Sequence, residues 1–259
     1  MHVAPHEFRA IRSGPVTLRF AELGPVAFVL ADIPSGSAGT LLEQPCERSH
    51  WGFVLEGQIA VERGDARATL DAGTAFHVPA GAPSHRLVSS GPARAAGFEI
   101  VEPDVRTDDD GLRERGFEVV AAPDTSDLPS VDVKVPERGR IDCRMTRMGS
   151  LAMSQARFGP LSGYASNWCD LPHWGIVLDG SVAIEWEDSI EVLSAGDVYR
   201  CPQGPPGHRI QAADPAFLLD LTPLDAVTPD VRTVDWRRRL FDLRAPSKGQ
   251  AGVVQAAIG

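Results

Sequence analysis

The chain has 259 residues, 43% of them hydrophobic, which is enough for two ordinary domains with buried cores. Its formal net charge of −10 argues against nucleic acid or an anionic membrane as the main partner. No apolar run is long enough to cross a bilayer, and the N-terminal segment lacks the profile of a signal peptide, so we expect a cytoplasmic protein. The four cysteines are too few for a dense disulfide framework, so free thiols or metal ligands are expected.

The predicted elements are short strands, because 25 glycines and 21 prolines are spread too evenly for long helices. Residues 53–62 (FVLEGQIAVE) predict a strand, a turn at Gly57 and a second strand, and residues 72–81 predict a further strand between turns. Residues 121–136, rich in Pro, Asp and Ser, are interpreted as a linker. Residues 176–185 (IVLDGSVAIE) and 195–204 then repeat the two strand patterns, with Gly180 at the turn position.

An internal repeat relates the two halves of the chain. The segment HWGFVLEGQIAVE begins at His50, and HWGIVLDGSVAIE begins at His173, 123 positions later. The match runs without a gap as far as Arg86 and places His85 opposite His208. A duplication predicts two tandem domains, at residues 1–120 and 137–259, on either side of the linker at 121–136. Two copies of a short-stranded unit favour an all-β fold made of two double-sheet barrels of the jelly-roll type.

The spacing of particular residue types within each copy resembles that of the cupin superfamily. The second cupin motif, Gly-x5-Pro-x-Gly followed by His, fits Gly73, Pro79, Gly81 and His85, and the second copy fits it in the same way. The first motif departs from the family pattern, because His50 stands where a Glu is usual, Cys46 replaces the second His and Gln44 replaces the first. The second copy has His173, Cys169 and Asn167 at these places. The chain thus resembles a bicupin with a Cys-x3-His variant of the first motif, and the resemblance implies two double-stranded β-helix barrels, each with a metal site.

The residue types in each cluster are suited to a metal ion. Gln44, Cys46, His50 and Gly52 share parity, so a regular strand would point all four into the barrel, and His85 would reach them from the opposite side. One thiolate and two imidazoles favour zinc, with iron or nickel as alternatives. The predicted ligands are Cys46, His50 and His85 in the first barrel and Cys169, His173 and His208 in the second. Buried Cys and His also serve ordinary packing, and it is their retention in both copies that favours a metal.

Other residues near each cluster are expected to leave room for a ligand or to contact it. Gln44 and Asn167 are weak ligands and are predicted to contact substrate or water. Gly52 and Gly175 are expected to leave space through which a substrate approaches. The two copies differ near the mouth, so one barrel should bind ligand better than the other; the differing pairs are His77 and Arg200, Ala82 and Pro205, and Ser84 and Gly207.

These observations lead to two function hypotheses. The first is a metal-dependent bicupin enzyme acting on a small organic molecule by isomerase, cyclase, lyase or oxygenase chemistry. The second is a binding or sensing protein without turnover. A polar pocket beside an open coordination position favours the enzyme, whereas a sealed, apolar, metal-free barrel favours the alternative. The expected partner is a small-molecule ligand rather than nucleic acid or membrane, and a homodimer is left open.

Overall fold

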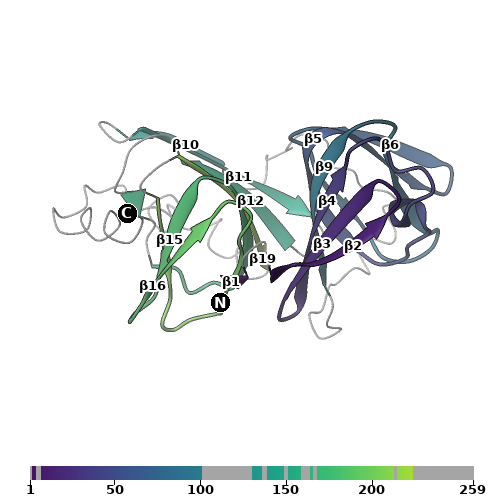
Figure 1. The fold of residues 1–259 in the computed structure, drawn as a ribbon. Coiled ribbons are helices and arrows are strands. Elements are labelled where there is room, and N and C mark those ends of the chain that lie inside the picture. The colour runs from purple at the N-terminus through teal and green to yellow at the C-terminus, as the bar shows by residue number, and fades with distance from the viewer. Residues whose placement is uncertain are drawn as a thin grey trace. The chain divides into compact units, whose positions relative to one another are not determined.

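The protein is described here by a computed structural model (Figure 1). The structure describes residues 2–3, 7–100, 130–135, 139–148, 151–158, 164–165, 168–212 and 215–223. Within these ranges almost all regular structure is strand, and η2 (Leu41–Glu43) is one turn of 3-10 helix. The all-β jelly-roll fold predicted from the sequence is confirmed. No helix in these ranges has the length and hydropathy needed to span a membrane.

The chain divides into two compact units. The N-terminal barrel comprises His6–Asp124 with Met148–Ser150, and the C-terminal barrel comprises Met1–Pro5, Thr125–Arg147 and Leu151–Gly259. The chain start contributes to the C-terminal barrel because β1 (His2–Val3) pairs with β17 (Val198–Cys201). Part of the segment interpreted as a linker forms β10 (Ser130–Val135), which pairs with β11 (Gly139–Met148), a strand that follows the segment. The rest of the segment, residues 121–129 and 136, lies outside the described residues.

The N-terminal barrel is built around one long strand, β5 (His50–Arg63). Its first half pairs with β7 and β9, and its second half pairs with β6 and β8, so the strand belongs to both faces of the barrel. Apolar side chains from both faces, including Val54, Ile59 and Phe76, form the core between them. The remaining strands are β2 (Arg9–Ser13), β3 (Val16–Leu23), β4 (Val26–Ile33), β6 (Ala66–Asp71), β7 (Ala75–Val78), β8 (His85–Val88) and β9 (Ala93–Ile100).

Gly57 bends β5 where it passes from one face to the other. Its φ of 71° is in the left-handed region that favours glycine, as the sequence predicted. The predicted chain reversal is wrong, however, because Gly57 still pairs with Ala93, and the next residue, Gln58, pairs with Asp71 on the other face. The positive φ of Gly57 thus lets one strand pass from one sheet to the other. In a hairpin, the same Glu-Gly pair would reverse the chain.

The C-terminal barrel repeats this plan with two separate sheets. A seven-stranded sheet has the order β1-β17-β14-β19-β12-β11-β10, and a four-stranded sheet has the order β13-β18-β15-β16. Gly180, with a φ of 72°, lies between β14 and β15 at the place of Gly57. The strands not yet given are β12 (Leu151–Phe158), β13 (Tyr164–Ala165), β14 (His173–Asp179), β15 (Ser181–Glu185), β16 (Ile190–Ser194), β18 (Arg209–Ala212) and β19 (Ala216–Pro223).

Candidate metal centre

Main-chain hydrogen bonds bring the distant members of each cluster together. The Cys46 N–H donates to the His85 carbonyl at 2.8 Å, and the His85 N–H donates to the Cys46 carbonyl at 2.8 Å. Cys169 and His208 form the same isolated bridge, with distances of 2.7 and 2.9 Å. In each barrel the histidine of the second cupin-like motif therefore lies directly beside the cysteine of the first motif.

The third member stands at the start of a strand facing this bridge. His50 begins β5, and its Nε2 lies 3.2 Å from Cys46 Sγ. His173 begins β14, and its Nε2 lies 3.1 Å from Cys169 Sγ. In each barrel the candidate ligand atoms of the three side chains all lie within 4.8 Å of one another. The structure thus brings together the three residues of each predicted set.

The spacing of the candidate ligand atoms in both clusters suits a single metal ion. Zinc bonds of ~2.3 Å to sulfur and ~2.0 Å to nitrogen separate neighbouring ligand atoms by about 3.5 Å, close to the sulfur–nitrogen distances observed. The Nδ1 atoms of His85 and His208 are buried and have no hydrogen-bond partner among the described residues. A buried imidazole nitrogen without a partner is costly, and a metal ion would satisfy it.

The histidines are held in the neutral form that binds metals. Burial lowers the pKa of His85 and of His208 to about 4, and the pKa of His173 to about 3. Burial also lowers the pKa of His50, although the nearby Glu99 opposes this shift. Desolvation disfavours the imidazolium, so each ring presents a free lone pair at neutral pH.

A second layer of side chains orients the strand histidines. The Nδ1 of His173 lies 2.7 Å from the Thr222 hydroxyl, which leaves Nε2 turned toward the sulfur. Such a partner on the far nitrogen is typical of metal-ligating histidines. In the N-terminal barrel Glu99 occupies the place opposite His50, and Arg48 binds its carboxylate at 2.5 Å. Sequence reasoning missed Thr222 and Glu99, although extending the 123-residue offset beyond Arg86 would have placed them opposite each other.

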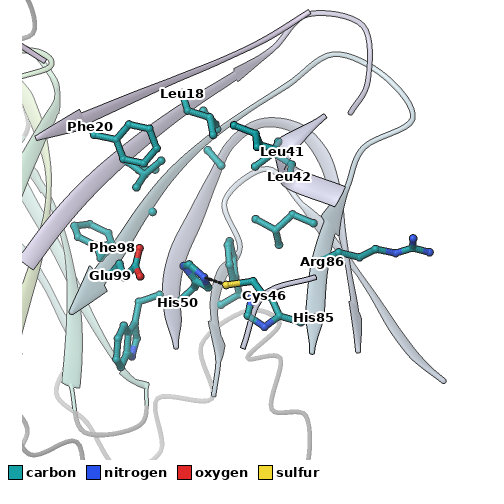
Figure 2. Close-up of a pocket in the computed structure, with 18 of the residues that line it drawn as sticks. Leu18, Phe20, Leu41, Leu42, Cys46, His50, His85, Arg86, Phe98 and Glu99 are labelled. Atoms are coloured by element: carbon teal, nitrogen blue, oxygen red, sulfur yellow. Dashed lines mark hydrogen bonds between the residues drawn. The ribbon is translucent and has the colours of Figure 1, made fainter. Parts of the chain in front are cut away.

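A cavity of about 200 Å³ adjoins the N-terminal cluster. Figure 2 shows Cys46, His50 and His85 on one side of it and Leu18, Phe20, Leu41 and Leu42 on the other, with the Arg86 side chain directed away. Gln44 also lines this cavity, as predicted for a residue in contact with substrate or water, but that role stays a prediction. Asn167, its counterpart, lies outside the described residues.

The two glycines beside the clusters do not leave room for a substrate, contrary to expectation. A Cβ at Gly52 would lie 2.2 Å from the Phe76 ring, and one at Gly175 would lie 2.3 Å from the Tyr199 ring. Each glycine therefore accommodates an aromatic side chain of the neighbouring strand, which crosses above it. The open space in the N-terminal barrel lies elsewhere on the barrel wall, beside Gly97 and Leu87.

The C-terminal barrel has a buried polar pair where the N-terminal barrel has apolar groups. The Tyr199 hydroxyl donates a hydrogen bond to the Asp220 carboxylate, and both side chains are buried. Burial raises the pKa of Asp220 to about 7, although the Tyr199 hydrogen bond opposes this shift. In the N-terminal barrel, the strand register places Phe76 where the C-terminal barrel has Tyr199, and Gly97 where it has Asp220.

Comparison with known proteins supports the fold. Residues 30–101 match the family model of the cupin domain. No curated protein matches the sequence. Among solved structures, AerE from Microcystis aeruginosa is 17% identical with a TM-score of 0.57, over 84% of this chain and 97% of that one. A variant of oxalate decarboxylase OxdC from Bacillus subtilis is 12% identical with a TM-score of 0.62, over 86% and 77% of the two chains.

A third structure, oxalate decarboxylase from Lactobacillus farciminis with formate, is 12% identical with a TM-score of 0.61, over 86% of each chain. At these identities the likeness extends to the fold and not to the substrate. Together with the match of residues 30–101 to the cupin domain model, it shows that the chain has the jelly-roll fold found in cupins.

Proposed function

We propose that each barrel binds one divalent metal ion through its Cys-x3-His motif and its distant histidine, and that the protein is a metal-dependent bicupin enzyme acting on a small organic molecule. The observation that carries this proposal is the convergence of the same three side chains in both barrels. Zinc is the favoured ion because a thiolate and two neutral imidazoles are ligands that it prefers, and iron and nickel are the alternatives.

A metal bound here would act as a Lewis acid or activate a water molecule, and the surrounding residues would position the substrate. In the N-terminal barrel Glu99 lies on the cavity wall, where Arg48 fixes its carboxylate, so it is placed to accept or donate a proton. The proposal includes isomerase, cyclase, lyase and oxygenase chemistry. The ligand is a small molecule, because the acidic chain favours neither nucleic acid nor an anionic membrane.

A binding or sensing protein without turnover is the second candidate function. The observation that favours it is the cavity wall, which is apolar over most of its area and has few groups able to transfer a proton. Both functions use the same metal. They differ in whether a bound ligand is converted, which product analysis after prolonged incubation distinguishes.

The first prediction concerns metal content. After reconstitution with zinc, the wild-type chain should retain two ions, whereas Cys46→Ser and Cys169→Ser should each retain one, because each substitution removes a ligand from only one cluster. Elemental analysis after gel filtration measures this directly. Zinc should also protect Cys46 and Cys169 from iodoacetamide, as followed by mass spectrometry.

Cys201→Ala is the matched control. Cys201 is buried in the core of the C-terminal barrel and belongs to neither cluster, so this variant should retain two ions. Parallel reconstitution with Fe²⁺ under anaerobic conditions and with Ni²⁺ tests the choice of metal. A wild-type chain that retains none of the three metals would refute the proposal.

A further inference from the structure

The barrel interiors differ in the row of residues next to the clusters. In the C-terminal barrel, Gly175 pairs with Tyr199 on one side and with Asp220 on the other. A Cβ at Gly175 would lie 2.3 Å from Tyr199 Cζ and 2.6 Å from Asp220 Oδ1, so the two side chains meet directly over this glycine. Their side chains, joined by a hydrogen bond, occupy the space over Gly175.

The same row holds fewer side-chain atoms in the N-terminal barrel. Gly52 pairs with Phe76 and with Gly97, so one partner lacks the hydroxyl of Tyr199 and the other lacks a side chain. Gly97 and Phe76 both line the cavity of about 200 Å³. A Cβ at Gly97 would have its nearest neighbours at 3.7 Å, which is ordinary van der Waals contact, so a side chain fits there without strain on the backbone.

The cavity combines apolar walls with the metal-binding cluster. Beyond the cluster and three polar residues, Gln44, Arg86 and Glu99, its wall is formed mainly by aliphatic and aromatic side chains from several strands and from η2. These include Leu18, Phe20, Val29, Leu41, Leu42 and Leu87 (Figure 2). The charge of Glu99 within the cavity is balanced by Arg48. At about 200 Å³ the cavity is smaller than the ~300–1,000 Å³ of pockets for drug-sized ligands, so the occupant is small.

The charge of the cluster determines the head group of the occupant. A divalent ion on one thiolate and two neutral imidazoles keeps a net positive charge, and it prefers an anionic oxygen ligand at its open position. We propose that the N-terminal barrel binds a small carboxylic acid with an apolar body, its carboxylate on the metal and its body against the leucines. The C-terminal barrel excludes this ligand because Tyr199 and Asp220 fill the equivalent space. This inference rests on the metal site of the proposed function.

Calorimetry with phenylacetate tests the inference, with acetate providing the head group alone and benzyl alcohol the body alone. Zinc-loaded protein should bind one phenylacetate per chain at least tenfold more tightly than either, because acetate buries no ring and benzyl alcohol has no carboxylate to bind the metal. Cys46→Ser should lose this binding, whereas Cys169→Ser should keep it. Three results would overturn the inference: equal affinity for acetate and phenylacetate, two phenylacetate molecules bound per chain, or loss of phenylacetate binding in Cys169→Ser alone.

A size series at Gly97 tests the location of the ligand. Gly97→Leu should weaken phenylacetate binding at least tenfold by filling the cavity, whereas Gly97→Ala, the matched control, should have a smaller effect. Both variants should retain two zinc ions, because Gly97 is not a ligand. Unchanged binding by a folded Gly97→Leu variant would contradict the proposed place. Zinc retention without phenylacetate binding overturns this inference alone, whereas failure to retain any of zinc, Fe²⁺ and Ni²⁺ overturns the proposed function.

Discussion

Replacement of Asp220 by asparagine should flatten the pH dependence of stability of the C-terminal barrel. Burial raises the pKa of Asp220 from 3.8 to about 7, so the folded state keeps a proton that the unfolded state releases above pH ~4. The free energy of unfolding must therefore fall as the pH rises from ~4 to ~7 and level off above that range. The full effect is roughly 4 kcal/mol, since one pKa unit corresponds to about 1.4 kcal/mol.

Urea denaturation at pH 5, 6.5 and 8 measures this effect. Asparagine keeps the oxygen that accepts the Tyr199 hydrogen bond and removes the titration, so the stability of Asp220→Asn relative to wild type should increase with pH. Asp188→Asn is the control, because Asp188 is exposed on the same barrel and should leave the wild-type profile unchanged. Parallel profiles for wild type and Asp220→Asn would show that Asp220 does not titrate in this range.

Gly57→Ala should be among the most destabilising single substitutions in the N-terminal barrel. Its φ of 71° is unfavourable for alanine, and the added Cβ would lie 2.1 Å from the Pro92 carbonyl oxygen, a backbone atom that cannot move aside freely. The left-handed conformation alone costs ~1–2 kcal/mol, and the clash should bring the total loss to roughly 3 kcal/mol or more. Denaturant unfolding at pH 5, with tryptophan fluorescence as the probe, gives the value.

Gly39→Ala separates the two contributions. Gly39 has the same φ of 71°, but a Cβ added to it would have no neighbour within 4 Å, so only the conformational cost applies. We expect a loss of about 1–2 kcal/mol for this variant. A loss at Gly57 no greater than that at Gly39 would mean that β9 shifts easily and that the close approach of Pro92 is not required.

The fold and the convergence of the Cys and His side chains could be predicted because both depend on patterns that a single sequence carries. The ungapped repeat supported the set by presenting it twice. The resemblance to a known motif order indicated that His85 joins the set. These features are local, or repeat at a fixed distance.

The regular strand expected from Gln44 to Gly52 is wrong, because Gln44 follows η2, Cys46 forms an isolated bridge and β5 begins only at His50. The expected approach of His85 from the opposite side of the barrel is also wrong, because its backbone pairs directly with Cys46.

The cavity could not be predicted, because it depends on which side chains meet from different strands. Gly52 suggested space beside the cluster, but the sequence does not show that the Phe76 ring crosses above it. Gly97 and Asp220, which occupy equivalent positions in the two barrels, lie beyond the ungapped match that ends at Arg86. In β10, Val131, Val133 and Val135 alternate as in a strand, yet the surrounding Pro, Asp and Ser favoured a linker.

The main-chain bridge between Cys46 and His85 has a consequence for how such a site can change over time. Both hydrogen bonds of the bridge use backbone atoms, so they persist with any residue other than proline at the two positions. The barrel thus separates the placement of the ligands from their chemistry. Point substitutions at these positions can exchange sulfur for nitrogen or oxygen, and with it the preferred metal, while the backbone stays in place. In a jelly roll of this kind, a single substitution at either bridge position can change the preferred metal without a change in the backbone.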